Sequence, residues 1–357
     1  MSVEIIAVPG IPEVREGDDL GAVVVRAVRA AGLELRAGDV LVVASKIVSK
    51  ARGLRRYASR DSVIADETAR VVAERQAGDR VTRVVESVAG PVMAAAGVDE
   101  SNVGDMGGVL VLPRDPDGAA AELLASVRAA WAAEGGGGDV GPLGVVVSDT
   151  AGRPWRAGVV DFALGSAGVR VLDDHRGGVD ADGRELSVTV IAVADEIAAA
   201  ADLVKAKSGA LPVAIVRGLP WASDHPDEPG AAGLVRTGPG DWFRTGQVEA
   251  VRSALGVEPG SPESEAVGIR SAGALEDVDV RARRVLALAL HGLGPDVTGC
   301  VTGAAGTVTI ELEASSAYLL GRVVERASVA AAGEDLRLGA TDLLGARAVL
   351  TLDSTWA

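Results

Sequence analysis

Lysine is rare in this chain, and its few copies lie in two short clusters. Of the 35 lysine and arginine residues in the 357-residue sequence, only Lys46, Lys50, Lys205 and Lys207 are lysine. This bias indicates that arginine has replaced lysine at ordinary surface positions. Lysine then remains where a compact ammonium group is needed, because the two side chains bind phosphate differently. Chance clustering is the alternative.

The first lysine cluster follows an apolar run at 40–44, which predicts a buried strand. Ser45, Lys46, Ser49 and Lys50 come directly after this run. Ammonium groups, serine hydroxyls and loop amides can all donate hydrogen bonds to phosphate oxygens. The segment therefore predicts an anion site where the strand ends in a loop. The alternative is that Lys46 and Lys50 are solvated residues that open a helix.

Oxygen ligands gather at two further places. Asp99 and Asn102 lie in a turn that begins with glycine, and Asp149 and Thr150 follow an apolar run. Carboxylates at strand ends suit Mg2+ or Mn2+, which bind one or two of them and keep positions for substrate phosphates. Arg156 follows closely, and mixed charge at a loop favours phosphate and metal together. Ordinary turn hydrogen bonds, or an arginine paired with Asp149, are the alternatives.

Composition argues against several kinds of partner. A formal charge of −15 and only nine aromatic residues oppose binding to nucleic acids. The single cysteine, Cys300, forms no disulfide within the chain and fits a reducing compartment. No apolar stretch approaches the roughly 18 residues of a membrane helix, so we expect a cytoplasmic protein. The two commonest glycine-rich nucleotide fingerprints are also missing.

The apolar periodicity predicts a mixed α/β (α+β) fold. Expected strands are 3–8, 40–44, 81–85, 109–112, 144–147, 169–172, 186–193, 212–216, 307–312 and 348–352. Expected helices are 20–31, 66–76, 117–133, 194–204, 281–291 and 315–332. A polar segment rich in proline and glycine predicts a linker at 251–265, between a domain at 1–250 and a small C-terminal α/β domain at 266–357.

Several segments match one family in order and spacing. They are 10–13, 17–20, 45–50, 96–103, 149–156 and 194–196. Over about residues 1–250 the chain closely resembles the coenzyme F420:L-glutamate ligase family. The resemblance implies that family's fold and a homodimer. It implies a ligase that uses GTP, with Mg2+ or Mn2+ at two sites and with K+ as a stimulating ion in some members. Such a ligase joins L-glutamate to coenzyme F420-0 through an acyl phosphate and releases GDP and phosphate.

The resemblance also implies roles for individual residues. Residues expected at the GTP site are Ile11, Pro12, Glu13, Val14, Ser45, Lys46, Lys50 and Asn102. Asp99 and Asp149 match the ligands of one metal, and Thr150 matches a ligand of the second. We expect Lys50, Asp149 and Arg156 to take part in catalysis. The residues do not decide between GTP and ATP, or how many glutamates are added.

One loop departs from the family pattern. Archaeal members carry an acidic or amide side chain there for the second metal, whereas this chain has Lys205 and Lys207. Either the second metal has fewer protein ligands, or these lysines neutralise phosphate instead. The tail beyond residue 256 lies outside the resemblance and has no assigned role. The alternatives for function are a nucleotide- or F420-binding protein without turnover, and a ligase for a related phosphorylated carboxylic acid.

Overall fold

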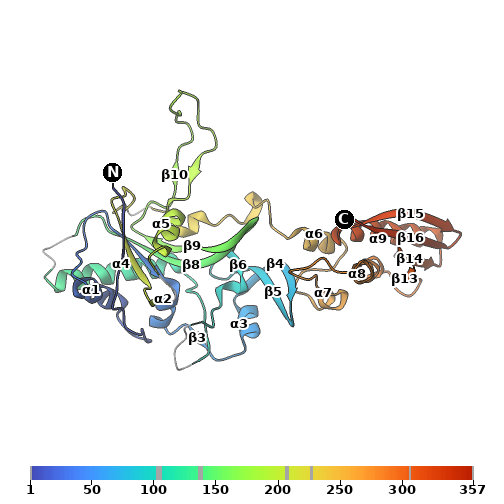
Figure 1. Cartoon of the computed structure of the whole chain (residues 1–357), viewed down its shortest axis with the longest axis horizontal. Helices are drawn as coiled ribbons and strands as arrows, with labels where there is room; N and C mark the ends of the chain where they lie inside the picture. The colour runs from blue at the N-terminus through green and yellow to red at the C-terminus, as the bar shows by residue number, and fades with distance from the viewer. Residues whose placement is uncertain are drawn as a thin grey trace. The chain divides into compact units, whose positions relative to one another are not determined.

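The computed structural model describes residues 2–101, 107–135, 140–205, 209–225, 228–304 and 307–355 (Figure 1). Its contacts divide the chain into two compact units. The first unit holds Met1–Ala69 and Glu86–Thr237, and the second holds Arg70–Val85 and Gly238–Ala357. None of the helices among the described residues is long and apolar enough to cross a membrane.

A mixed five-stranded sheet forms the centre of the first unit. Its strand order is β1 (Glu4–Ala7), β12 (Val213–Arg217), β2 (Val40–Ala44), β8 (Gly144–Arg153) and β9 (Arg156–Ala167). Strands β2 and β8 run parallel, and the other neighbouring pairs are antiparallel. This mixed sheet with its helices confirms the expected α/β (α+β) class.

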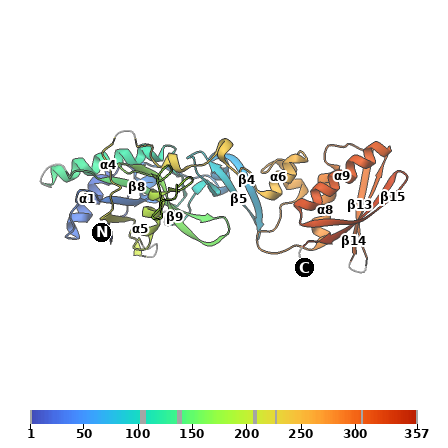
Figure 2. The same cartoon turned by 90° about the horizontal axis from the view of Figure 1, so that it is seen from above.

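Helices cover both faces of this sheet. Helices α1 (Leu20–Ala30) and α4 (Pro116–Ala133) pack on one face, and α5 (Val193–Asp202) packs on the other (Figure 2). The side chains of β2 alternate between the two apolar clusters, so the strand is buried on both sides. That burial explains why the sequence of β2 is apolar throughout.

Side-chain caps fix where the first two long helices begin. Asp19 accepts a hydrogen bond from the Ala22 N–H at the start of α1, as its sequence predicts. Asp115 does the same for α4, whose first residue is Pro116. Helix α5 has no such cap, but acidic residues occupy its first turn and favour the positive end of the helix dipole.

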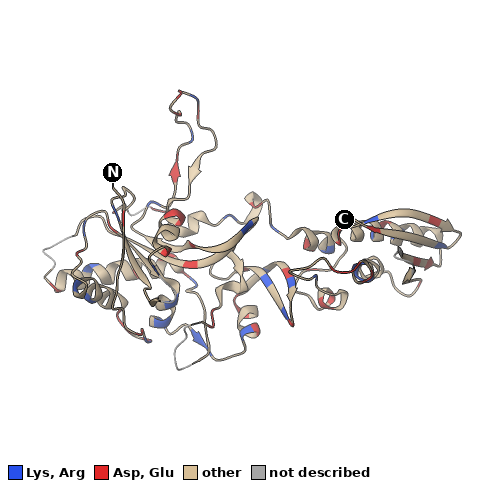
Figure 3. Cartoon of the chain, in the orientation of Figure 1, with Lys and Arg blue, Asp and Glu red and all other residues tan. Residues whose placement is uncertain are grey.

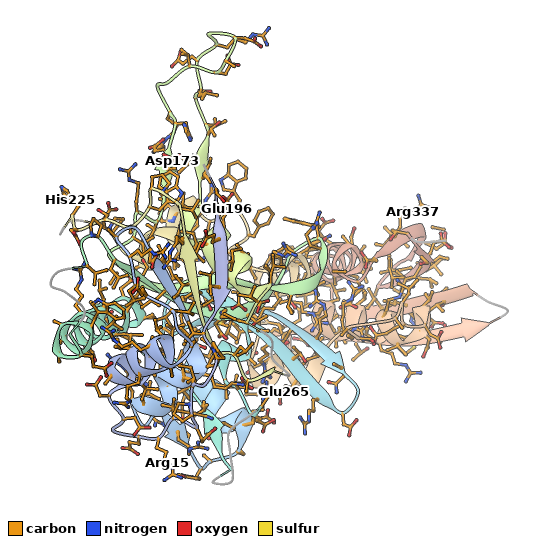
Figure 4. The ribbon with its side chains drawn as sticks, turned by 60° about the vertical axis from the view of Figure 1, so that its left-hand side comes forward. Arg15, Asp173, Glu196, His225, Glu265 and Arg337 are labelled. Carbon is orange, nitrogen blue, oxygen red and sulfur yellow. The ribbon has the colours of Figure 1, made fainter. Side chains whose placement is uncertain are left out.

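Short elements complete the first unit. They are α2 (Ser45–Ala51), β3 (Arg55–Arg56), α3 (Arg60–Asp66), β6 (Val92–Ala94), η1 (Ala95–Gly97), β7 (Val109–Leu110), β10 (Asp173–Asp174), β11 (Val190–Ile191) and η3 (Ala231–Leu234). The chain between β10 and β11 projects from the sheet, with Asp173 at its base (Figure 4).

Three sequence-based expectations were wrong. The helix expected at 66–76 is instead the strand β4 (Thr68–Ala77), in which burial alternates along the strand. The run 169–172 makes one isolated bridge, because Gly168, with φ of +65°, ends β9. Its valines are nevertheless buried against α5. Of the strand expected at 186–193, the structure retains β11 alone.

The second unit contains an antiparallel four-stranded sheet covered by helices. The sheet order is β13 (Val297–Ala304), β14 (Thr307–Ala314), β16 (Arg347–Ser354) and β15 (Leu336–Leu344). Helices α8 (Val278–Leu290) and α9 (Ala317–Gly333) share one apolar core with this sheet. Helices α6 (Gln247–Ala254), α7 (Pro262–Val267) and most of the hairpin β4–β5 (Arg80–Ser87) also belong to this unit.

The sequence predicts domains at 1–250 and 266–357 with a linker at 251–265, and these boundaries stay a prediction. The contacts of the structure group the residues differently. Leu255 and Val257, in the expected linker, are buried in the core of the second unit. Hairpin residue Glu74 accepts hydrogen bonds from Gly260 and Ser264 in the same segment. A hairpin inserted between strands of the first unit therefore packs on residues far along the chain, which local composition does not reveal.

Candidate functional site

A pocket of about 780 Å3 opens in the first unit, beside the sheet. The segment before α1, helix α2, residues 93–101, strands β8 and β9 and the chain after α5 all contribute side chains. The sequence-predicted residues that line it are Ile11, Pro12, Glu13, Val14, Ser45, Lys46, Lys50, Asp99, Asp149, Thr150 and Lys205. Asn102 and Lys207, also expected here, lie outside the described residues.

All three lysines that the structure describes line this one pocket. Lys46 and Lys50 lie one helical turn apart on α2, which follows β2 without a loop. The sequence interpretation of a strand that ends in a loop was therefore wrong, and the helix alternative is confirmed. Lys50 is not solvated, however, because its side chain is only 6% exposed. Figure 3 shows the basic residues of α2 and β3.

Each lysine of α2 pairs with an acid of the same pocket. The Lys50 ammonium donates to Glu13 Oε1 at 2.5 Å. The Lys46 ammonium lies 2.7 Å from Asp99 Oδ2 and donates to Ser101 Oγ at 2.8 Å. Since Glu13 and Asp99 are both partly solvent-exposed, these two pairs can exchange partners when an anion or a cation arrives.

Asp149 and Thr150 lie within a β-hairpin. The sequence placed them at a loop, but β8 continues to Arg153 and turns back into β9. This pairing sets Asp161 of β9 directly opposite Thr150. The Thr150 hydroxyl donates to Asp161 Oδ1 at 2.7 Å. The hairpin thus brings a third aspartate to the pocket, which composition and motif matching had missed.

Lys205 reaches the same group from the end of α5. Its ammonium donates to Asp161 Oδ2 at 2.7 Å and to Ser148 Oγ at 2.6 Å. The Ser148 hydroxyl in turn donates to Asp161 Oδ2 at 2.9 Å. Both charged side chains are almost wholly buried. Lys205 is therefore an internal partner of a carboxylate in this structure.

Of the four aspartates that line the pocket, Asp99, Asp149 and Asp161 differ in electrostatic environment. Burial opposes ionisation of Asp161 and of Asp99. The nearby Lys205 and Lys46 ammonium groups outweigh it, and the pKa of both carboxyls lies below the usual value. Burial raises the pKa of Asp149 to about 6, and the negative charges of Asp161 and Asp99 add to that rise.

Within the described part of the chain, no lysine, arginine or histidine forms an ion pair with Asp149. A half-buried carboxylate whose pKa is raised by desolvation and by neighbouring negative charges gains most from an added cation. The oxygen donors around it, from Asp149, Asp99 and Thr150, are of the kind that Mg2+ and Mn2+ prefer. The residues present therefore fit a hard divalent cation.

The described residues contain no group of three or more His, Cys, Asp or Glu side chains arranged to hold a metal ion by themselves. A cation in this pocket would consequently draw part of its coordination from hydroxyl, water or substrate oxygens. Magnesium sites commonly have that composition, with one or two carboxylates and substrate phosphates.

Arg156 is the described catalytic candidate that the structure does not bring to the pocket. It lies exposed at the turn of the β8–β9 hairpin and is absent from the pocket lining. The two residues that sequence reasoning missed, Ser148 and Asp161, are connected by the hairpin register. Counting outward from the turn at Pro154 pairs Thr150 with Val159, and only the register shift between Gly152 and Arg153 makes Asp161 its partner.

The site is a pocket of the first unit in which lysine and aspartate side chains lie close together. The pattern of the family described as F420-0:Gamma-glutamyl ligase matches residues 10–218, a range that includes every pocket residue named above. The chain belongs to this family and is a ligase. This confirms the resemblance noted in the sequence.

Individual relatives support the same assignment. The coenzyme F420:L-glutamate ligase of Methanothermobacter thermautotrophicus is 37% identical over 265 residues, covering 68% of this chain and 100% of that protein. The Methanopyrus kandleri protein of the same name is 40% identical over 263 residues, covering 68% and 98%. That of Halorubrum lacusprofundi is 38% identical over 265 residues, covering 68% and 96%.

Proposed function

We propose that this chain joins L-glutamate to coenzyme F420-0, giving F420-1, and that further rounds extend a γ-linked tail. Relatives that carry this activity in their names align with 68% of this chain over nearly their whole length. The observation that carries the proposal is one pocket, inside the matched region, that gathers three lysines and four aspartates. Amide synthesis from a carboxylate needs activation, which we assign to GTP.

The nucleotide phosphates would lie against α2. Lys46 and Lys50 present ammonium groups on one side of the pocket, and Ser45 adds a hydroxyl there. Their present acidic partners would exchange for phosphate oxygens. The segment Ile11–Val14 borders the same space and would contact the rest of the nucleotide.

Asp149 and Asp99 would hold Mg2+ or Mn2+, and Thr150 stays a predicted ligand of a second ion. A bound divalent cation would offset negative charge on the phosphate oxygens. The chain's own contribution is to orient the carboxylate of F420-0 toward the γ-phosphate, so that an acyl phosphate forms and the amine of glutamate displaces phosphate. Stimulation by K+, a homodimer and a cytoplasmic location also stay predictions. The catalytic role expected of Arg156 is not part of this proposal, because Arg156 lies exposed outside the pocket.

The direct test is to incubate the full chain with F420-0, L-glutamate, GTP, Mg2+ or Mn2+, and K+, and to follow the mass of the coenzyme. We expect mass gains of whole glutamyl units with the unaltered chain and none with Asp149→Ala. Asp174→Ala is the matched control, because Asp174 is an exposed aspartate outside the pocket. Binding of F420-0 and GTP without any mass gain would favour a binding protein.

A further inference from the structure

The Lys205–Asp161 ion pair differs from the other ion pairs of the pocket in its burial. Both of its side chains are buried, at 4% and 5% exposed. Lys50 is buried as well, at 6% exposed, but the acids that pair with Lys50 and Lys46 are 60% and 41% exposed and can be solvated when they separate. A buried pair cannot separate without leaving a charge unpaired in a poorly solvated place, and that loss is large. Lys205 therefore stays with Asp161 while the lysines of α2 can change partners.

Hydrogen bonds extend this pair to the hydroxyls of β8. Asp161 accepts from Thr150 through one oxygen, and from Ser148 and Lys205 through the other. Lys205 also donates to Ser148. The hydroxyl protons of Thr150 and Ser148 are thereby directed at Asp161. The oxygen of Thr150, a pocket-lining residue, keeps a lone pair for a ligand.

We propose that Lys205 is a positioning residue that serves as a built-in cation of this site. It neutralises Asp161, fixes the Thr150 and Ser148 hydroxyls, and leaves Asp149 with Asp99 as the seat of a single divalent cation. In this proposal the Lys205 ammonium takes the place of the second ion for which Thr150 was a predicted ligand. Asp161 is already satisfied by an ammonium group, so it has no charge left to attract a second metal ion. This inference rests on the proposed function only for the identity of the substrates.

Lysines of this pocket have two different roles, the neutralisation of phosphate and the compensation of a protein carboxylate, which the sequence did not distinguish. Neutralising phosphate requires an ammonium group that can leave its partner, which fits Lys46 and Lys50. Lys205 instead compensates a protein carboxylate. The sequence left two alternatives for the loop after α5: a second metal with fewer protein ligands, or lysines that neutralise phosphate. The proposed role of Lys205 differs from both, because its ammonium group replaces the second metal ion and does not bind phosphate.

The test counts Mn2+ bound to the metal-stripped full chain, with Mn2+ alone as the probe and electron paramagnetic resonance to measure the free ion. We expect one Mn2+ per unaltered chain and none for Asp149→Asn. Lys205→Met removes the ammonium and should admit a second Mn2+ at Asp161. Lys205→Met combined with Asp161→Asn should return the count to one, and Lys205→Arg should keep it at one.

A count of two for the unaltered chain overturns the proposal, and so does a count of zero up to millimolar Mn2+. A folded Lys205→Met that still binds a single ion overturns it as well. If Lys205→Met does not fold, the test rests on the unaltered chain and on the double variant, each of which we expect to bind one Mn2+ per chain. Glutamyl addition measured on the same preparation is separate: its absence alongside a count of one contradicts the proposed function and leaves the built-in cation standing.

Discussion

Both units of the molecule bury charged side chains, but they compensate them differently. In the second unit, Glu334 is wholly buried and accepts from Arg252 and Arg284, each at 2.8 Å, while Arg284 also reaches Glu276. Every charge of this cluster has an opposite partner. In the first unit, Asp149 lines a pocket with no described ion-pair partner, and its pKa is raised. A buried charge with opposite partners therefore marks a stabilising cluster, whereas a half-buried charge without an ion-pair partner, beside a cavity, marks a site for a ligand.

Removing the pocket acid should have the largest effect on activity. We expect Asp149→Asn to lower the rate of glutamyl addition by at least about 100-fold, because the variant loses a charge that acts in the reaction. The rate of mass gain at saturating GTP measures it. In the second unit, Glu334→Gln should leave the rate per folded molecule unchanged. An equal loss of rate in Asp149→Asn and Glu334→Gln would contradict the difference between the two units.

Removing the acid of the second unit should have the largest effect on stability. Glu334→Gln leaves two buried guanidinium groups without their shared partner, so we expect a loss of roughly 3–5 kcal/mol in the free energy of unfolding of that unit. Denaturant unfolding measures it. Glu325→Gln, an exposed position of α9, is the matched control and should change little. A loss below about 1 kcal/mol for Glu334→Gln would contradict the structural role.

Removing the pocket acid should instead stabilise the metal-free protein. The Asp149 pKa is raised from 3.8 to about 6, so the folded state holds a proton that the unfolded state releases. Stability is therefore lost as pH rises from below 4 to above 6. Asp149→Asn removes this loss and should gain up to about 3 kcal/mol at neutral pH, and nothing below pH 4. Thermal unfolding across this range, with a chelator present, measures the gain; a loss at neutral pH would contradict it.

Arg156 should give the smallest effect. Its exposure at the hairpin turn predicts that Arg156→Ala changes the rate of glutamyl addition by no more than about 2-fold. Lys50→Met, inside the pocket, serves as the comparison and should weaken GTP binding clearly. If Arg156→Ala abolishes activity in an otherwise folded chain, the site extends beyond the pocket and the catalytic role expected from the sequence stands.

Much of the first unit could be predicted because its signals are local. Helix α1 lies almost where its apolar period predicts it, the apolar run of β2 is buried on both faces, and the three lysines that the structure describes gather at one pocket. The sequence failed where long-range pairing decides. The pairing of Thr150 with Asp161 depends on hairpin register, and the alternation of β4 was mistaken for a helix.

The second unit shows the same limit. Its helix α8 and strand β14 were expected nearly where they lie, because each has a clear apolar period. The packing of the β4–β5 hairpin with residues 246–272 was not expected. These contacts join positions about 175 residues apart, such as Glu74 and Glu249. No local pattern encodes such a distance.

The proposed function requires that the pocket of the first unit couple the cleavage of GTP to the formation of an amide. The measurement that tests it most directly counts GDP released and glutamyl units added in the same reaction, with F420-0 present and then omitted. The account predicts one GDP for each glutamyl unit, and no GDP without F420-0. Glutamyl addition without GDP release, or GDP release that ignores F420-0, would contradict it.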